Sequence, residues 1–198
     1  MKHSDVKLQC GDAVLSAHKS LLAARSPVFS AMFDHDMIEK QTGVVNIPEK
    51  DPETLKSFLD FIYTGRVDMK DYKSASKLIM VADEYQVASL KETCSMFLMS
   101  ALTPENACEI LELADMFNIK LLKNCALNYF AKHMQDISNS SQWSKFMQKE
   151  KNPKLWMEII QHLAKNFEIS PQGNKKELKN AATKITAPGR NAKTVFSK

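Results

Sequence analysis

The change in hydrophobic period near residue 18 is the feature that most constrains the fold of this chain. Residues 5–17 alternate polar and apolar side chains around Gly11-Asp12, which predicts a β-hairpin. From His18 onward the apolar residues recur mainly at helical spacing, with one short β-prone run at residues 44–47. Strands followed by a long series of helices predict an α+β domain and then a small all-α segment.

Cap residues indicate where several helices begin. In three places an N-cap residue stands directly before a proline, which suits the first helical turn. These pairs are Ser26-Pro27, Asp51-Pro52 and Thr103-Pro104. Gly65 is expected to end the second of these helices, and further helices are expected within residues 72–100, from Ile119 and from Pro153. We expect no internal repeat.

A break at Leu102 divides the predicted helices, so we expect one domain over residues 4–101 and a helical segment over 102–165. Residues 166–198 lose the helical pattern and are expected to form a basic flexible tail. This tail holds seven Lys and Arg against two Glu, whereas residues 1–165 hold 20 basic and 21 acidic side chains. Because the folded part lacks a basic stripe with stacking aromatics, we expect no nucleic-acid partner.

Composition excludes several classes of protein. No run approaches 18 consecutive apolar residues, so we expect no membrane-spanning helix and no membrane partner. The first residues lack the apolar core of a signal peptide, which indicates an intracellular protein. The four cysteines form no Cys-x-x-Cys pair, so neither zinc nor disulfides are expected, and each should pack as a small buried apolar residue. They are Cys10, Cys94, Cys108 and Cys125.

His18 and Asp5 are the candidates for a polar pair with a chemical role. His18 lies at the junction of the hairpin and the first helix, and Asp5 at the start of the first strand is a plausible partner. A catalytic pair would need a nucleophile and an oxyanion donor, and the sequence offers no motif for either. We therefore expect a structural polar link, and no enzymatic activity, cofactor, metal or small-molecule substrate.

Met37 and Ile38 are large apolar residues within the polar stretch at residues 34–43, which follows the second predicted helix. Apolar residues in such a stretch either fold back onto the core or anchor a partner, whose orientation the adjacent carboxylates would fix. From the residues alone, both alternatives stay open.

The run AHKSLLAARSPVFSAMF at residues 17–33 resembles the signature of the BTB (POZ) domain, as do SDV at residues 4–6 and FIYTG at residues 61–65. Within this family the chain is most similar to the speckle-type POZ protein group, because ACEILELAD at residues 107–115 resembles the helical segment that follows their BTB domain. The resemblance implies a BTB/POZ fold over the first domain and a BACK-like, or 3-box, segment after it.

This resemblance implies a non-catalytic adaptor of a cullin-3 ubiquitin ligase. In the group, an apolar-x-Glu motif after the second small helix seats its apolar residue in a pocket on the cullin. The matching residues are Met37 and Glu39, with Ile38 between them. The family thus favours partner binding for this stretch, and burying one Met side chain would contribute about 2 kcal/mol, or roughly thirtyfold in affinity.

The resemblance also implies self-association, as a homodimer or as a heterodimer with other BTB proteins. Leu21 matches a position of the dimer interface, and a second self-association surface on the last helix maps near Ile160. The amphipathic helix that usually precedes the first strand has no counterpart here, so we expect a weakened dimer.

Three questions about function stay open. The MATH domain that recognises substrates in the speckle-type group is expected to be absent, so the chain would act either as an adaptor or as a competitor for cullin-3. A module that only self-associates, as in BTB transcriptional regulators, is the alternative function. The basic tail is either a nuclear localisation signal or a solvated end, so the expected location is the nucleus, the cytoplasm or both.

Overall fold

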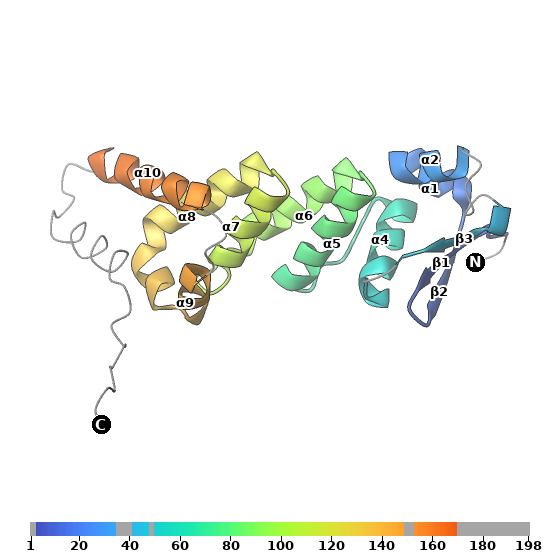
Figure 1. Cartoon of the computed structure of the whole chain (residues 1–198), viewed down its shortest axis with the longest axis horizontal. Coiled ribbons are helices and arrows are strands. Elements are labelled where there is room, and N and C mark those ends of the chain that lie inside the picture. The colour runs from blue at the N-terminus through green and yellow to red at the C-terminus, as the bar shows by residue number, and fades with distance from the viewer. Residues whose placement is uncertain (1–2, 35–40, 48–49, 149–152, 170–198) are drawn as a thin grey trace, which may run out of the picture.

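The computed structural model describes residues 3–34, 41–47, 50–148 and 153–169, which form an elongated array with the sheet at one end and the last helix at the other (Figure 1). The strands are β1 (Val6–Cys10), β2 (Ala13–Ala17) and β3 (Val44–Asn46). The helices are α1 (Lys19–Arg25), α2 (Pro27–Asp34), α4 (Pro52–Thr64), α5 (Tyr72–Glu84), α6 (Ala88–Ser100), α7 (Ala107–Met116), α8 (Lys120–Asn139), α9 (Ser141–Gln148) and α10 (Pro153–Ile169).

The predicted hairpin is confirmed. β1 pairs antiparallel with β2, with Val6 opposite Ala17, and parallel with β3, which gives the sheet order β2-β1-β3. Gly11 takes a φ of 55° in the turn, a left-handed conformation that glycine adopts without steric cost. Alternate residues of β1 are buried, as the period of two requires.

The start of α2 is fixed by the buried Ser26. Its Oγ accepts a hydrogen bond from the Phe29 amide at 3.2 Å and donates one to the Tyr85 carbonyl at 2.6 Å. The Phe29 ring stacks on the Tyr85 ring with centroids 4.6 Å apart, and Phe58 packs beside both. The predicted cap at Ser26 is therefore confirmed, and it also joins α2 to the end of α5.

The helix α4 begins and ends where the sequence predicts. The Asp51 side chain accepts a hydrogen bond from the Thr54 amide at 2.9 Å and pairs with the Lys77 ammonium of α5 at 3.0 Å. Although burial acts in the opposite direction, these hydrogen bonds lower the pKa of Asp51 from 3.8 to about 2. Gly65 follows the helix in the left-handed conformation, with φ at 69°.

The prediction that a helix begins at Thr103-Pro104 is wrong by a turn, because α7 starts at Ala107. The buried Asn106 side chain accepts a hydrogen bond from the Thr103 amide at 2.8 Å and donates one to the Ala101 carbonyl at 2.7 Å. These bonds hold residues 104–106 in a turn that precedes the helix.

The helix α9 was not expected from the sequence. It has only eight residues, and the Ser140 hydroxyl accepts a hydrogen bond from the Trp143 amide at 3.3 Å before its first turn. Trp143 and Phe146 lie one turn apart, and both pack against Trp156 of α10. A helix this short carries too few periodic positions to be detected reliably.

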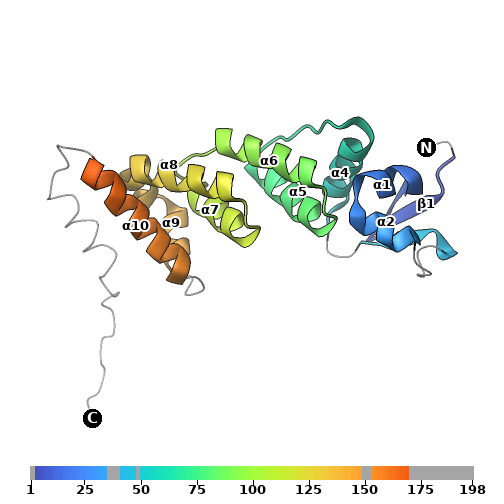
Figure 2. The same cartoon turned by 90° about the horizontal axis from the view of Figure 1, so that it is seen from above.

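The expectation that the chain holds no internal repeat is wrong. The segment ADEYQVASLK at residues 82–91 and the segment ADMFNIKLLK at residues 114–123 occupy the same positions in two successive helix hairpins, α5–α6 and α7–α8. Figures 1 and 2 show these hairpins side by side along the array, between α4 and α10. Each segment spans the end of one helix, the corner and the first turn of the next.

The two corners have the same backbone geometry. Gln86 and Asn118 hold equivalent positions with φ of 52° and 51°, a conformation that amide residues tolerate better than most. The next residue donates an amide hydrogen bond back to the equivalent alanine, at 2.7 Å in the first corner and 2.8 Å in the second. We therefore regard the α7–α8 hairpin as a second copy of the α5–α6 hairpin.

The buried side chains form two clusters. One surrounds the sheet and α4–α6 and includes Ile110, Ala114 and Leu122, whereas the other joins α7 to α10. Because α7 and α8 supply residues to both clusters, the core runs on past Leu102, and a boundary between residues 101 and 102 stays a prediction. Residues 166–169 of the predicted tail are helical, because α10 continues to Ile169, and residues 170–198 lie outside the described residues.

Three of the four cysteines pack as expected. Cys10, Cys94 and Cys108 are buried, whereas Cys125 is half-buried, so full burial of Cys125 was wrongly predicted. Burial raises the pKa of Cys94 to about 12, so this thiol stays protonated at neutral pH.

Replacing the N-cap of α4 tests how much its charge contributes. Asp51→Ala should lower the free energy of unfolding by about 1 kcal/mol at neutral pH. Because folding lowers the pKa of Asp51, its charge stabilises the fold above about pH 4, and this contribution fades as the pH falls toward 2. Chemical denaturation of both proteins between pH 2 and 7 should show the difference shrinking in acid.

The exposed Asp68 provides the control, since Asp68→Ala should change the unfolding free energy by less than roughly 0.5 kcal/mol. A difference between wild type and Asp51→Ala that stays constant over this pH range would contradict the role assigned to the Asp51 charge.

Candidate protein-binding surfaces

The segment expected to bind a partner joins α2 to β3. Met37, Ile38 and Glu39 lie outside the described residues, so their role stays a prediction. The helix before them is described up to Asp34, whose carboxylate accepts a hydrogen bond from the Ser30 hydroxyl at 3.1 Å. The strand after them begins at Val44 and pairs with β1, so both neighbouring elements belong to the folded core.

Leu21 presents an apolar side chain on α1. It is 41% exposed, whereas its neighbour Leu22 is fully buried. A large apolar side chain that the fold leaves in water suits an interface, although its role in dimerisation stays a prediction. We call this region the α1 surface, defined by Leu21.

Asp5 and His18 hold separate parts of the junction between sheet and helices. The Asp5 carboxylate accepts a hydrogen bond from the Lys19 amide at 2.8 Å. The Tyr63 hydroxyl accepts one from the His18 amide at 2.9 Å and lies 2.7 Å from Nδ1 of the His18 ring. Asp5 thus ties β1 to α1 and His18 ties α1 to α4, while a direct bond between Asp5 and His18 stays a prediction. Sequence reasoning missed Tyr63, which the family signature at residues 61–65 contains.

The outward face of α10 carries a second apolar stripe. Met157 and Ile160 are 56% and 42% exposed, and Ala164, one turn further, is also exposed. The opposite side of the helix is buried through Leu155 and Ile159. We call the exposed stripe the α10 surface, defined by Met157, Ile160 and Ala164; the predicted role of Ile160 in self-association is untested.

The α1 surface and the α10 surface belong to opposite ends of the molecule. Figures 1 and 2 show α1 beside the sheet at one end of the array and α10 at the other, with the two helix hairpins between them. Two partners could therefore bind at these surfaces without competing for the same space.

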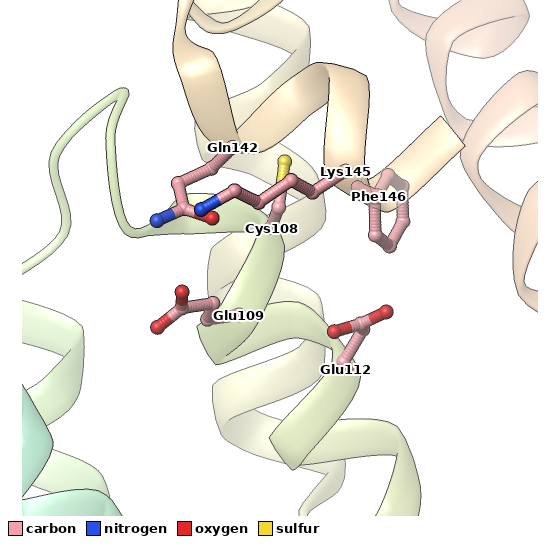
Figure 3. Close-up of a pocket in the computed structure, with 6 residues that line it drawn as sticks. All are labelled: Cys108, Glu109, Glu112, Gln142, Lys145 and Phe146. Carbon is pink, nitrogen blue, oxygen red and sulfur yellow. The ribbon is translucent and has the colours of Figure 1, made fainter. Parts of the chain in front are cut away.

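A small pocket lies between α7 and α9 (Figure 3). Glu109 and Glu112 line it from α7, and Gln142, Lys145 and Phe146 line it from α9. Its volume of about 160 Å³ is below the several hundred Å³ that small-molecule sites usually need. A pocket of this size is more typical of the contact between the polar side chains of two helices than of a substrate site.

The part of the chain that the structure describes lacks two further kinds of feature. Within it, no group of three or more His, Cys, Asp or Glu is arranged to hold a metal ion. The described helices also include none that is long and apolar enough to cross a membrane.

Comparisons with known proteins give relatives of this chain. The chain is 36% identical over 162 residues to the mouse (Mus musculus) TD and POZ domain-containing protein 4, and equally so to TD and POZ domain-containing protein 2. These matches cover 81% of this chain but 43% and 44% of the relatives, so the chain spans less than half their length. The BTB domain of zebrafish PATZ1 matches 48% of this chain and 75% of its own, with 25% identity and a TM-score of 0.42.

The family comparison gives the assignment. The BTB/POZ domain family matches residues 1–102, which include the whole sheet, α1, α2 and the helices α4–α6. The first part of the α+β fold is accordingly a BTB fold with a three-stranded sheet, followed by further helices. The chain therefore belongs to the BTB/POZ domain family, whose domain mediates protein–protein interaction and self-association.

Proposed function

We propose that this chain is a non-catalytic cullin-3 ubiquitin-ligase adaptor of the speckle-type POZ protein group, which binds cullin-3 and self-associates. The observation that carries the proposal is the BTB/POZ match over residues 1–102, which includes the segment with the apolar-x-Glu motif. In this motif Met37 would enter an apolar pocket on the cullin, and Glu39 would fix the orientation through its charge.

The position of this segment supports the proposal. It follows α2, whose start is held by the hydrogen bonds of Ser26, and precedes β3, which is paired in the sheet. Both elements that flank the segment in the sequence are therefore fixed in the fold, and a rigid scaffold beside a binding segment favours affinity.

Self-association through both ends of the array is the second part of the proposal. Leu21 on the α1 surface and Ile160 on the α10 surface are each about two-fifths exposed, at opposite ends of the molecule. If the α1 surface pairs with the α1 surface of a second chain, and the α10 surface pairs with the α10 surface of a third chain, the two kinds of contact alternate and join the chains into open assemblies.

Binding to the N-terminal domain of cullin-3, measured by calorimetry, tests the first part. Wild type should bind, and Met37→Ala combined with Glu39→Ala should weaken the affinity by at least about thirtyfold, because the apolar anchor and its charged neighbour are lost. A matched control removes another exposed Met and Glu from α6, through Met96→Ala and Glu92→Ala, and should leave the affinity unchanged.

Two results would count against the cullin contact. A folded wild type that shows no binding would favour the alternative function, a BTB module that only self-associates. Equal loss of affinity in the two double variants would show that the motif has no special part in the contact.

Light scattering after size-exclusion chromatography tests the second part. Wild type should form species larger than dimers as concentration rises, and Leu21→Asp or Ile160→Asp alone should stop assembly at dimers, because a carboxylate in an apolar interface costs several kcal/mol. The double variant should be monomeric. As a control, Leu121→Asp changes a more exposed leucine, 68% exposed on α8, and should assemble like wild type.

A single variant with an unchanged mass distribution would remove its surface from the proposal. Monomeric wild type at all concentrations would reject self-association through either surface.

A further inference from the structure

The two copies of the helix hairpin place a lysine at equivalent positions. Lys91 follows the first corner and pairs with Asp83 at 2.5 Å, and Lys123 follows the second corner and pairs with Asp115 at 2.6 Å. In both copies the aspartate lies eight residues before the lysine, so each pair ties the two helices of one hairpin together. The shared geometry indicates a shared structural role.

Each lysine also binds a residue outside its own hairpin. The Lys91 ammonium donates a hydrogen bond to the Phe117 carbonyl at the end of α7, at 2.8 Å. The Lys123 ammonium binds Glu158 of α10. The first lysine thus couples the first hairpin to the second, and the second lysine couples the second hairpin to α10.

The charges around Lys123 are partly shielded from water. Its side chain is 17% exposed, and those of Asp115 and Glu158 are 26% and 31% exposed. Burial acts to lower the pKa of Lys123, but the hydrogen bonds to both carboxylates outweigh it and raise the pKa. An ammonium that stays charged between two carboxylates provides a strong, directional link.

Direction matters because the other contacts of α10 are mainly apolar. Leu155, Ile159 and Leu163 on its buried side belong to the second core cluster. The free energy of apolar burial depends on the buried area and not on direction. One flank of the helix carries polar links to α8, where Glu158 binds Lys123 and His162 lies 2.8 Å from Asn128. These polar contacts are directional, so they restrict the rotation of α10 about its axis more than apolar burial alone does.

We propose that Lys123 is a positioning residue that acts through Glu158 to hold α10 so that the α10 surface faces outward for self-association. The inference rests on the self-association proposed above. Without the Lys123–Glu158 pair, α10 would keep its apolar contacts and the contact between His162 and Asn128, but its rotation about its own axis would be less narrowly fixed. Met157 and Ile160 would then be presented in the right place for only part of the time, which lowers the apparent affinity.

The experiment uses the chain of residues 1–198 with Leu21→Asp, so that only the α10 surface remains to be measured. Glu158→Gln removes the charge but keeps the shape, and Glu92→Gln makes the same change at an exposed position on α6 as a control. Lys123→Arg retains a cation between the carboxylates and should weaken dimerisation less than Glu158→Gln does. Sedimentation equilibrium gives the dimer dissociation constant, and hydrogen exchange reports the local stability of α10.

Glu158→Gln should raise amide exchange in α10 and weaken dimerisation, each by roughly tenfold, while exchange in α5 and α6 stays unchanged. Combined with Ile160→Asp, which already abolishes the contact, Glu158→Gln should have no further effect on the mass distribution. A general loss of stability would instead raise exchange throughout the second core cluster.

Each contrary result has its own meaning. Unchanged exchange in α10 would overturn the positioning role. Faster exchange with unchanged dimerisation would also overturn it, provided that Ile160→Asp still weakens the dimer. If the chain with Leu21→Asp alone is monomeric at every concentration, the α10 self-association surface fails, and the inference fails with it.

Discussion

The two hydrogen bonds of the Ser26 hydroxyl are the interactions on which the packing of α2 against the helical array depends most. This hydroxyl is almost fully buried, and it caps α2 through the Phe29 amide while it donates to the Tyr85 carbonyl. One small side chain thus joins the helix before the proposed recognition segment to the first corner of the helical array. Because Phe29 also stacks on Tyr85, the polar link and the apolar core fix the same junction.

The equivalent backbone carbonyl accepts a side-chain hydrogen bond at both corners of the array. The Tyr85 carbonyl at the first corner accepts a hydrogen bond from Ser26, and the carbonyl of its counterpart Phe117 accepts one from Lys91. Each corner is therefore held by a polar side chain from an earlier part of the chain: Ser26 holds the first corner, and Lys91 of α6 holds the second. Such an array keeps the α1 surface and the α10 surface at a defined separation (Figure 2).

Local signals in the sequence were sufficient for the first half of the fold. The alternation around Gly11, the cap pairs at Ser26 and Asp51, and Gly65 each act within a few residues, so their effects could be predicted without knowledge of distant contacts. Asn106 escaped prediction because its side chain competes with the first turn of the helix it precedes. The repeat escaped because its two copies share little beyond Ala, Asp, Leu and Lys at matching positions, and hydrophobic periodicity does not compare segments with each other.

The surfaces were harder to predict than the fold. Periodicity places Ile160 on a helix beside the buried Ile159, but only the packed structure shows that Ile160 stays exposed. Leu21 and Leu22 pose the same problem on α1, since both are leucines and only one is buried. The family resemblance, not the pattern, singled out the exposed member of each pair, and it is also the basis for assigning Met37 and Glu39.

The two copies of the hairpin differ in how well their corners are enclosed. Tyr85 is 3% exposed and packs within the large core, whereas Phe117 is half-buried beneath Lys91, whose ammonium lies 6.0 Å from the ring centroid. Met116, at the second corner, is 73% exposed, where the first copy has Glu84. The second corner is thus less enclosed by apolar side chains than the first. The directional bond from Lys91 to the Phe117 carbonyl therefore contributes more at this corner, because it fixes the backbone where apolar burial is less complete.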